Sequence, residues 1–370
     1  MKICHITSVH PRYDIRIYLK MCCTLALYGY NVSLIVGDGN NDEVKENIKI
    51  YGIKKQKNRF LRLIKSPKLL YKKALEVNAN IYHLHDPELI SIGVRLKKIG
   101  KIVIFDSHED YQSQLLNKPY WNKYILNIIS KIYRLYEKKC IEKYDAIITA
   151  TPYIKEKISN RHPLVVDVNN FPMLDEFVNV KYLFSTNENI LSVCYVGGLT
   201  ENRGIKEIIK AMEYCSSNVK LKLAGEFTPL TLKKDVSIYE GWEKTEWLGF
   251  IDRSKIGELF SESFAGLVIL KPIINYLDAL PIKLFEYMSA GLPVIASNFP
   301  LWKKIVEENQ CGICVDPSKP EEISSAIEWM MNNKEKAIEM GKNGKKAASE
   351  KYNWNIEKQK LLDVYKRVLS

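Results

Sequence analysis

Short apolar runs alternate with helical patterns along the chain, and polar or glycine-containing turns separate them. At the N-terminus, an apolar run at 1–8 is followed by a polar loop, a helical pattern from Ile17 to Tyr28 and a second apolar run at 31–36. Apolar runs bounded by turn residues are typical of buried strands. Their alternation with helices predicts a parallel, doubly wound sheet, so we predict the α/β fold class.

The same alternation continues to the C-terminus. Further strands are predicted at 79–84, 101–105, 145–150, 164–168, 191–196, 219–224, 245–248, 266–270 and 294–296, and helices from Ile205 and at 321–330, 338–348 and 355–369. A long amphipathic helix is predicted at 119–143, with most of its apolar face in the core or lining a cleft. The pattern restarts after a polar run at 185–189, which predicts domains at 1–170 and 190–350, a linker at 171–189 and a final helical segment at 351–370.

Length and composition agree with two globular domains in a reducing compartment. The chain has 370 residues, of which 46% are hydrophobic and 26% are charged. No apolar run approaches the roughly 18 residues of a transmembrane helix, and the N-terminus resembles a strand rather than a signal peptide. The eight cysteines are scattered, and the lone CxxC pair of Cys311 and Cys314 is assigned to packing. We therefore predict a cytoplasmic protein.

Positive charge is concentrated in the first part of the chain. Residues 1–150 contain 26 Lys and Arg against 14 Asp and Glu, and the segment 54–73 contains nine Lys or Arg, no acid and several interleaved apolar residues. This pattern is typical of a helix at a membrane surface, although a solvated helix with a core-facing side is common. A basic surface implies an anionic partner. Because no nucleic-acid-binding motif is recognisable, we predict an anionic membrane surface and no nucleic acid.

The stretch 275–299 predicts a loop, a helix, a turn and a buried strand. Pro281 suits the first turn of the helix, and Gly291 stands where the helix ends. The free backbone N–H groups of such a helix start bind anions, phosphate above all. Glu286 lies roughly 7 Å further along the axis, where a carboxylate can accept hydrogen bonds from sugar hydroxyls. The alternative is an ordinary helix in which Glu286 pairs with a lysine.

Polar clusters follow several strands of the first domain. Arg12, Asp14 and Arg16 follow the first strand, and the segments 83–88 and 106–111 follow two others. The carboxyl ends of parallel strands share one sheet edge, where ligands bind. His, Asp and Glu together also suit a metal, but no metal-binding spacing is present, so a hydrogen-bonding role is favoured and no metal is predicted.

The segment LPIKLFEYMSAGLPVIAS at 280–297 resembles the nucleotide-sugar signature of the retaining GT-B glycosyltransferases of family 4. The motifs HPRYDIR, HDPEL and DSHEDY are similar to the first domain of a subgroup of that family. The resemblance covers almost the whole chain. It implies the GT-B fold, in which two Rossmann-like doubly wound domains face each other across a cleft and the last helix crosses back onto the first domain.

The resemblance also implies roles for single residues. Glu286 matches the acid that binds the donor ribose, and Asp278 stands where the family usually has a Glu that holds the transferred sugar. In the Gly-rich turn after 191–196, Gly198 replaces an arginine that grips the diphosphate and Arg203 stands in for a lysine, while Lys271 is a further candidate cation. His108 matches a histidine that faces the donor sugar.

We assign the candidate residues to three groups. The catalytic group is His108, Arg203 and Asp278; the donor-binding group is Gly197, Gly198, Gly225, Phe250, Ile251, Lys271, Leu280, Pro281, Ile282 and Glu286; the acceptor-side group is Arg12, Asp14, Arg16, His85 and Glu109.

The predicted function is retaining transfer of a sugar from a nucleoside-diphosphate sugar to a glycan or lipid-linked acceptor in cell-surface polysaccharide assembly. The expected location is the cytoplasm, with peripheral binding at the inner face of the cell membrane, and no cofactor is expected besides the nucleotide sugar itself. The alternatives are a nucleotide-sugar epimerase or hydrolase of the same fold and a non-catalytic nucleotide-sugar-binding subunit.

Overall fold

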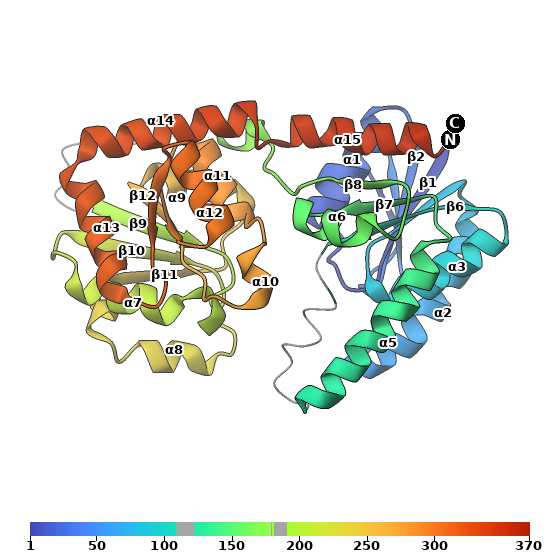
Figure 1. Cartoon of the computed structure of the whole chain (residues 1–370), viewed down its shortest axis with the longest axis horizontal. Coiled ribbons are helices and arrows are strands. Elements are labelled where there is room, and N and C mark those ends of the chain that lie inside the picture. The colour runs from blue at the N-terminus through green and yellow to red at the C-terminus, as the bar shows by residue number, and fades with distance from the viewer. Residues whose placement is uncertain (109–110, 112–121, 179, 181–190) are drawn as a thin grey trace. The chain divides into compact units, whose positions relative to one another are not determined.

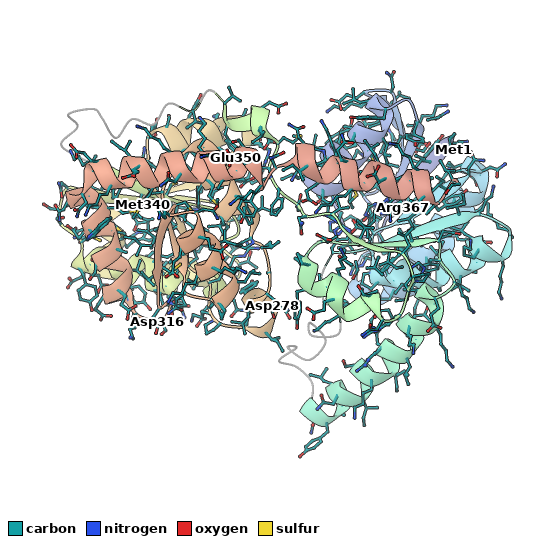
Figure 2. All side chains as sticks on the ribbon, turned by 45° about the horizontal axis from the view of Figure 1, so that its top comes forward. Met1, Asp278, Asp316, Met340, Glu350 and Arg367 are labelled. Carbon is teal, nitrogen blue, oxygen red and sulfur yellow. The ribbon has the colours of Figure 1, made fainter. Side chains whose placement is uncertain are left out.

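The computed structural model of the chain describes residues 1–108, 111, 122–178, 180 and 191–370 (Figure 1). The chain forms two compact units, Met1–Asn170 with Ile356–Ser370 and Phe171–Asn355. The final helix therefore belongs to the unit that contains the N-terminus, and Met1 lies near the helix end that carries Arg367 (Figure 2).

The first unit is built on one sheet of eight strands in the order β3-β4-β2-β1-β5-β6-β7-β8, parallel except for the β3–β4 pair. Its strands are β1 (Lys2–Thr7), β2 (Asn31–Val36), β3 (Glu43–Lys45), β4 (Ile48–Gly52), β5 (Ile81–Leu84), β6 (Ile102–Ser107), β7 (Ala146–Thr149) and β8 (Val165–Asp167). The chain winds outwards from β1 in both directions, as in a Rossmann domain.

Helices cover this sheet. They are a π-helix η1 (Ile15–Cys22) that continues into α1 (Cys23–Leu27), α2 (Arg59–Val77), the 3₁₀ turn η2 (Pro87–Leu89), α3 (Ile90–Lys98), α5 (Lys123–Ile141), α6 (Pro152–Ser159) and the C-terminal α15 (Trp354–Arg367). Leu70 of α2, Leu96 of α3 and Ile141 of α5 are buried in one core with strand residues such as Tyr82.

The second unit has a parallel sheet of six strands in the order β11-β10-β9-β12-β13-β14, which is the Rossmann order. Its elements are η3 (Leu174–Phe177), β9 (Leu191–Val196), η4 (Glu201–Arg203), α7 (Ile205–Tyr214), β10 (Val219–Ala224), α8 (Thr231–Val236), η5 (Glu240–Lys244), β11 (Thr245–Gly249), α9 (Arg253–Ser261), β12 (Ala265–Val268), α10 (Ile274–Leu277), α11 (Ile282–Ala290), β13 (Val294–Ser297), α12 (Pro300–Glu308), β14 (Gly312–Val315), α13 (Pro320–Asn332) and α14 (Lys334–Glu350).

Both faces of this second sheet are buried. Strand residues alternate between two cores, with Val193 and Tyr195 in one and Cys194 in the other. The first core includes α7 and α13, and the second includes α9, α11, α12 and α14. The prediction of an α/β fold with two Rossmann-like doubly wound domains is thus confirmed.

Four local features differ from the sequence expectations. The hairpin β3–β4 was not predicted, because its turn residues Glu46 and Asn47, both with positive φ, lack the Asn-Gly signature of such turns. The first helix begins at Ile15 rather than Ile17, because the Asp14 carboxylate accepts hydrogen bonds from the N–H groups of Arg16 and Ile17. The cysteines do not differ from the expectation, because all eight are free thiols.

The other two differences concern packing. The segment 171–178, predicted to be part of the linker, belongs to the second unit, because Phe171 and Phe177 are buried in its core; residues 179 and 181–189 lie outside the described part of the chain. The apolar residues of α5, predicted to be mostly core or cleft wall, are largely exposed between Tyr124 and Tyr136, whereas Leu126 is buried and Cys140 and Ile141 reach the core.

Candidate functional site

The turn after β9 brings two backbone segments into unusually close contact. Gly197 has φ +131° and donates its N–H to the carbonyl of Ala224 at 2.8 Å. Gly225 follows β10 with φ +144°, and a Cβ atom there would lie 1.9 Å from the Gly197 carbonyl oxygen. Only glycine fits both positions. The turn 197–204 is therefore held against the end of β10, with little side-chain bulk over it.

Two cations converge on this turn. A Cβ atom on Gly198 would lie 3.2 Å from Arg203 Nη1, and a Cβ atom on Gly197 would lie 3.0 Å from Lys283 Nζ and 3.5 Å from the same Arg203 nitrogen. Burial disfavours the charged form of Arg203, but Tyr195 and Tyr276 raise its pKa above the usual value. Lys283 was not among the predicted residues, because one lysine near a helix start is normally a solvated side chain.

Helix α11 begins beside this turn with an open N-terminus. Pro281 is its N-cap residue, and no side chain caps the free N–H groups of its first turn. The loop before the helix is held by Trp302, whose indole N–H donates to the Ala279 carbonyl at 2.7 Å. Leu284, Phe285 and Met288 anchor the helix in the core, and Leu280 packs against that core. The helix start predicted from the sequence is thus present and uncapped by a side chain, and its binding of an anion stays a prediction.

Glu286 is buried and paired with an arginine rather than a lysine. Arg253 Nη2 donates to Glu286 Oε1 at 2.9 Å, and Arg253 Nε donates to Glu176 Oε1 at 3.0 Å. Only 7% of the Glu286 side chain is exposed. Among the described residues its second oxygen, Oε2, has no hydrogen-bond donor, so it is available to a ligand hydroxyl.

Of four other predicted residues of the second unit, three have no ion pair among the described residues and one is paired with two acids. Asp278 is half-buried at the end of α10, near the start of α11 (Figure 2), and no ion pair joins it to a cation among the described residues. Phe250 is 74% exposed just after β11, with Ile251 partly buried beside it. Lys271, in contrast, pairs with Glu201 at 3.3 Å and Glu207 at 3.1 Å, so its charge is already neutralised.

The first unit contains a buried ion pair at the carboxyl ends of its strands. Arg16 donates from Nε and Nη2 to the two oxygens of Asp106 at 2.9 and 2.8 Å, and from Nη1 to the Val168 carbonyl at 2.6 Å. Arg16 is 4% exposed and Asp106 is fully buried. Burial raises the pKa of Asp106, but Arg16, His108 and the hydrogen bonds from His85 and Arg16 together hold this pKa well below its usual value. Arg16 therefore positions Asp106.

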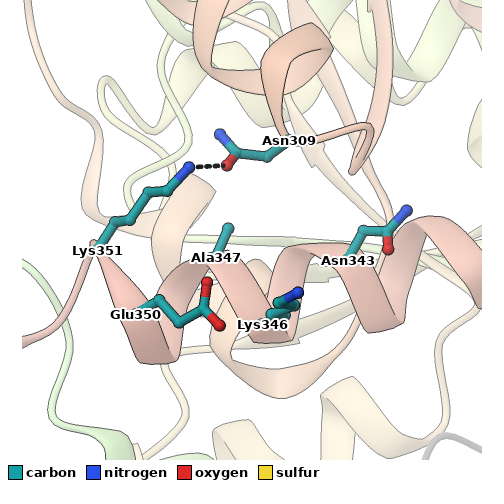
Figure 3. A pocket seen from close by; sticks show the side chains of 6 residues that line it. All are labelled: Asn309, Asn343, Lys346, Ala347, Glu350 and Lys351. Atoms are coloured by element: carbon teal, nitrogen blue, oxygen red, sulfur yellow. Dashed lines mark hydrogen bonds between the residues drawn. The ribbon is translucent and has the colours of Figure 1, made fainter.

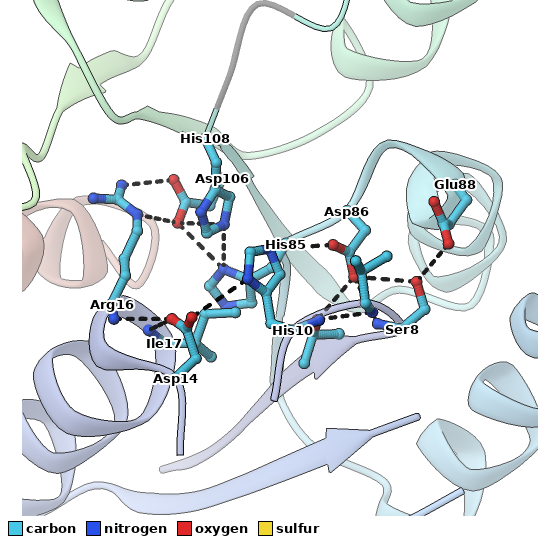
Figure 4. Close-up of polar contacts among 12 residues, drawn as sticks. Ser8, His10, Asp14, Arg16, Ile17, His85, Asp86, Glu88, Asp106 and His108 are labelled. Carbon is cyan, nitrogen blue, oxygen red and sulfur yellow. Dashed lines mark hydrogen bonds and ion pairs between the residues drawn. The ribbon is translucent and has the colours of Figure 1, made fainter. Parts of the chain in front are cut away.

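Asp106 is one end of a histidine network (Figure 4). Its Oδ2 lies 3.2 Å from both His85 Nδ1 and His108 Nε2, and these two rings lie 3.1 Å apart at the same nitrogens. His85 Nε2 is 2.8 Å from His5 Nδ1. The network continues through the hydroxyl of Tyr365 on α15, which is 3.3 Å from His5 Nε2 and 2.9 Å from His83 Nδ1.

A further histidine, His10, lies over the exposed end of this network. Its ring stacks on His108 with centroids 4.9 Å apart, and its nitrogens lie 3.4 Å from Asp14 and 3.5 Å from Asp86. Burial lowers the pKa of His10, but the hydrogen bond to Asp14 and nearby carboxylates raise it overall, and the pKa of Asp14 falls to about 2. His10 is the first residue of the HPRYDIR motif, but no role was predicted for it, because its contacts with Asp86 and His108 join distant segments of the chain.

Only some of the residues that were predicted for the acceptor side lie together in the structure. His85, Asp14 and Arg16 belong to this network, whereas Arg12 is occupied by Asp38 at 2.7 Å and Glu43 at 2.7 Å on the hairpin side. Glu109 lies outside the described residues.

Two groups within the network have metal-ligand atoms close together: His5 with His83 and His85, and His85 with Asp106 and His108. Hydrogen bonds already occupy most of these atoms, and Asp106 is neutralised by Arg16. We therefore interpret the cluster as a hydrogen-bonded network.

A small hollow of about 180 Å³ lies elsewhere, on α14 (Figure 3). Its lining residues are Asn309, Asn343, Lys346, Ala347, Glu350 and Lys351. None of the predicted site residues lines it, and Lys351 donates to Asn309 across it at 3.1 Å. No helix in the described ranges is both long and apolar enough to cross a membrane.

In a comparison with known proteins, each half of the chain matches a glycosyltransferase family model. Residues 16–167 match the family model "Glycosyltransferase Family 4", and residues 179–347 match "Glycosyl transferases group 1". An uncharacterized glycosyltransferase of Methanocaldococcus jannaschii is 24% identical over 305 residues, which cover 78% of this chain and 75% of the relative.

Solved structures agree at the level of the fold. Sucrose-phosphate synthase of Thermosynechococcus elongatus matches with a TM-score of 0.80 at 16% identity, covering 100% of this chain and 99% of that chain. HepE of Anabaena, in complex with UDP-glucose, matches with a TM-score of 0.74 at 14% identity and 99% coverage of each chain. Because glycosyltransferase models match both halves of the chain and its neighbours have the same fold, the protein is a glycosyltransferase of the GT-B fold.

Proposed function

We propose that the protein transfers a sugar from a nucleoside-diphosphate sugar, and that the second unit binds this donor. The observation that carries the proposal is the convergence of Arg203 and the open start of α11 on the Gly197–Gly198 turn. Cations and free N–H groups around a turn with little bulk suit a diphosphate. Glu286 stands one turn further along α11, where its free oxygen suits a ribose hydroxyl. The UDP-glucose in the HepE complex supports a donor of this class.

The remaining donor contacts follow from the same placement. Phe250 is exposed beside Ile251, so the two residues suit the face of the base. Asp278 has an uncommitted carboxylate near the start of α11 and suits a hydroxyl of the transferred sugar. Lys271 is a weaker candidate for the diphosphate, because two glutamates already neutralise it.

We further propose that transfer retains the configuration at the anomeric carbon and uses no protein nucleophile, metal or further cofactor. The departing diphosphate, stabilised by Arg203 and the α11 N-terminus, accepts the proton of the acceptor hydroxyl as the new glycosidic bond forms. His108 contacts the transferred sugar during this step. The protein contributes positioning and electrostatic stabilisation of the leaving group.

The acceptor is proposed to be a glycan or lipid-linked glycan at an anionic membrane surface, in cell-surface polysaccharide assembly. On α2, Lys65, Lys68 and Lys72 are exposed together with Leu63, Ile64 and Leu69. On α5, the apolar residues Tyr124, Ile125, Ile128, Ile129, Ile132, Leu135 and Tyr136 are exposed along one face. Apolar faces flanked by cations suit the interface of an anionic bilayer.

The experiment is a thermal-shift screen against UDP-, GDP-, ADP- and TDP-sugars, followed by transfer to lipid-linked glycan acceptors with the product anomer read by NMR. Stabilisation by one donor and transfer with retention are expected. Donor turnover without acceptor would identify a hydrolase or epimerase, and donor binding without turnover a non-catalytic subunit. Stabilisation by none of the donors would overturn the donor assignment.

A further inference from the structure

Lys283, the second residue of α11, carries a buried ammonium group that contacts the face of an aromatic ring but has no hydrogen-bond or ion-pair partner within the described part of the chain. Its Nζ atom is shielded from solvent and has no hydrogen-bond acceptor among the described residues. Nζ lies 3.7 Å from the centroid of the Tyr195 ring, on the side of the Gly197–Gly198 turn. A buried ammonium group normally gains hydrogen bonds or an ion pair, because burying it alone is costly. This lysine therefore lacks an anion that its position calls for.

The charges around Lys283 sharpen this conclusion. Arg203 Nη1 approaches the same side of Gly197, so two cations face one turn. Glu286, the nearest acid on α11, is bound to Arg253, which is also bound to Glu176. The neutral groups nearby are the Tyr195 and Tyr276 hydroxyls, and the Tyr195 hydroxyl donates to the Gly198 carbonyl at 3.2 Å.

The electrostatics agree with this geometry. Burial first, and then the charge of Arg203, hold the pKa of Lys283 well below its usual value, and Glu286 offsets this only in part. An anion placed at the turn would reverse both effects, because it would supply hydrogen-bond acceptors and reduce the repulsion between the two cations.

We propose that Lys283 is the second cation of the diphosphate site, reaching from α11 to the side of the turn where Gly197 carries no side chain. The proposal rests on the proposed nucleotide-sugar donor. The bound diphosphate supplies the oxygens that Nζ lacks, and Lys283 and Arg203 then hold it from α11 and η4 respectively. The glycines at 197 and 198 leave room for both cations. Lys283 thus stabilises the leaving group directly and would be a catalytic residue by contact.

The test compares the affinities of the variant Lys283→Met for ligands with and without phosphates. This substitution keeps the length of the side chain and removes its charge. Calorimetry would measure the affinities of inorganic pyrophosphate, UDP, GDP and ADP, together with uridine, guanosine and adenosine. Lys304→Met, an exposed change on α12, is the control. We expect Lys283→Met to lower the affinities for pyrophosphate and for the nucleoside diphosphate that binds at least tenfold. The affinity for the matching nucleoside should change less than twofold, and the melting temperature should stay unchanged or rise.

Each outcome decides between the two proposals. Equal losses for the diphosphate and its nucleoside, or unchanged diphosphate affinity, would overturn the role of Lys283 while leaving the donor assignment intact. If the wild type binds no nucleoside diphosphate, the donor assignment fails, and pyrophosphate binding alone then decides the role of Lys283. A melting temperature that falls by several degrees, with pyrophosphate affinity unchanged, would identify a purely structural lysine.

Discussion

Arg16 and Asp106, ninety residues apart in the chain, form a doubly hydrogen-bonded ion pair with distances of 2.9 and 2.8 Å. The pair joins the start of η1 to the end of β6, and Asp106 in turn holds His85 and His108 at 3.2 Å. The arginine therefore acts on the histidine network through the carboxylate. This relationship explains why a charged residue occupies the start of a helix, where the dipole disfavours it.

The first prediction concerns this buried pair. Asp106→Asn should lower the free energy of unfolding of the first unit by ~3–5 kcal/mol, because it leaves the buried Arg16 charge without its partner. Denaturant unfolding monitored in the first unit measures the loss. Glu43→Gln, which removes an exposed partner of Arg12, is the matched control and should have little effect. Similar stabilities of the two variants would contradict the positioning role of Asp106.

The second prediction concerns Glu286. Glu286→Ala should weaken nucleotide binding by ~1–3 kcal/mol, because ribose hydroxyls lose their acceptor in a buried site. Calorimetric titration of the folded variant with the nucleotide found in the donor screen measures the change. Glu308→Ala, an exposed change on α12, should leave the affinity unaltered. If the Glu286 variant binds the nucleotide as tightly as the wild type, Glu286 serves only to pair with Arg253.

The third prediction separates two cations near the Gly-rich turn. Arg203→Ala should lower turnover more than it lowers binding of the bare nucleoside, because its guanidinium faces the turn where the diphosphate is proposed to bind. Lys271→Ala should have a smaller effect, since Glu201 and Glu207 already neutralise that lysine. Steady-state kinetics and nucleoside titration measure both. Equal losses of turnover and nucleoside binding in Arg203→Ala would limit Arg203 to a structural role.

The fold and the backbone elements of the proposed donor site could be predicted from the sequence, because both depend on local sequence patterns. Alternating apolar runs predict the two sheets, and Pro281 and Gly291 mark the two ends of α11. Features that depend on long-range contacts were missed. Lys283 is notable only because Tyr195 and Arg203 lie close to it, and Lys271 is a weaker candidate only because Glu201 and Glu207 pair with it.

The same limit applies to burial. The pattern at 119–143 predicts an apolar helix face, but periodicity does not state whether another element covers that face. In the structure Leu126 and Ile141 are buried, whereas Ile128 and Ile132 are 58% and 62% exposed. The histidine network is a further example, because its members come from four separate segments and from α15 at the far end of the chain.

The fourth prediction concerns pH. Burial, followed by the charge of His85, lowers the pKa of His5 and His83 well below 6.5, and burial also lowers that of His108. In the unfolded chain these rings bind protons below about pH 6.5, so the native state loses stability as the pH falls through that value. The raised pKa of His10 acts in the opposite direction, with its contribution present at low pH and lost as the pH rises.

Three histidines have a lowered pKa and one has a raised pKa. We therefore expect the free energy of unfolding to decrease from pH 7.5 to pH 5.5. Carboxylates contribute little to this difference, because they titrate at lower pH in the unfolded chain. Urea unfolding of the first unit at the two pH values measures the change, and His83→Gln should reduce it. Equal stability at pH 7.5 and 5.5 would show that the histidines do not remain neutral in the native state.

The last prediction is salt-sensitive binding to anionic vesicles through α2 and α5. Each Lys or Arg near an anionic leaflet contributes about 1 kcal/mol, and this attraction falls off within a Debye length. Lys65, Lys68 and Lys72 are exposed, whereas Lys73 is paired with Glu76 at 2.8 Å and Arg62 with Glu88 at 3.0 Å. The three exposed lysines should therefore carry the electrostatic part, and the apolar face of α5 the part that resists salt.

Vesicle co-sedimentation at low and high salt separates these two parts. Changing Lys65, Lys68 and Lys72 to Glu should abolish the salt-sensitive binding, because α2, which contains six Lys or Arg and one Glu, would then contain three Lys or Arg and four Glu. Changing Ile128, Ile132 and Leu135 to Ser should leave weak binding that high salt removes completely, because only the electrostatic attraction remains. Lys303 and Lys304 changed to Glu on α12 provide the charge-matched control in the second unit. If the α2 variant sediments as well as the wild type, α2 is a solvated face and α5 alone binds the vesicles. If the wild type does not bind anionic vesicles at low salt, the membrane proposal fails, and the acceptor must be sought among soluble glycans.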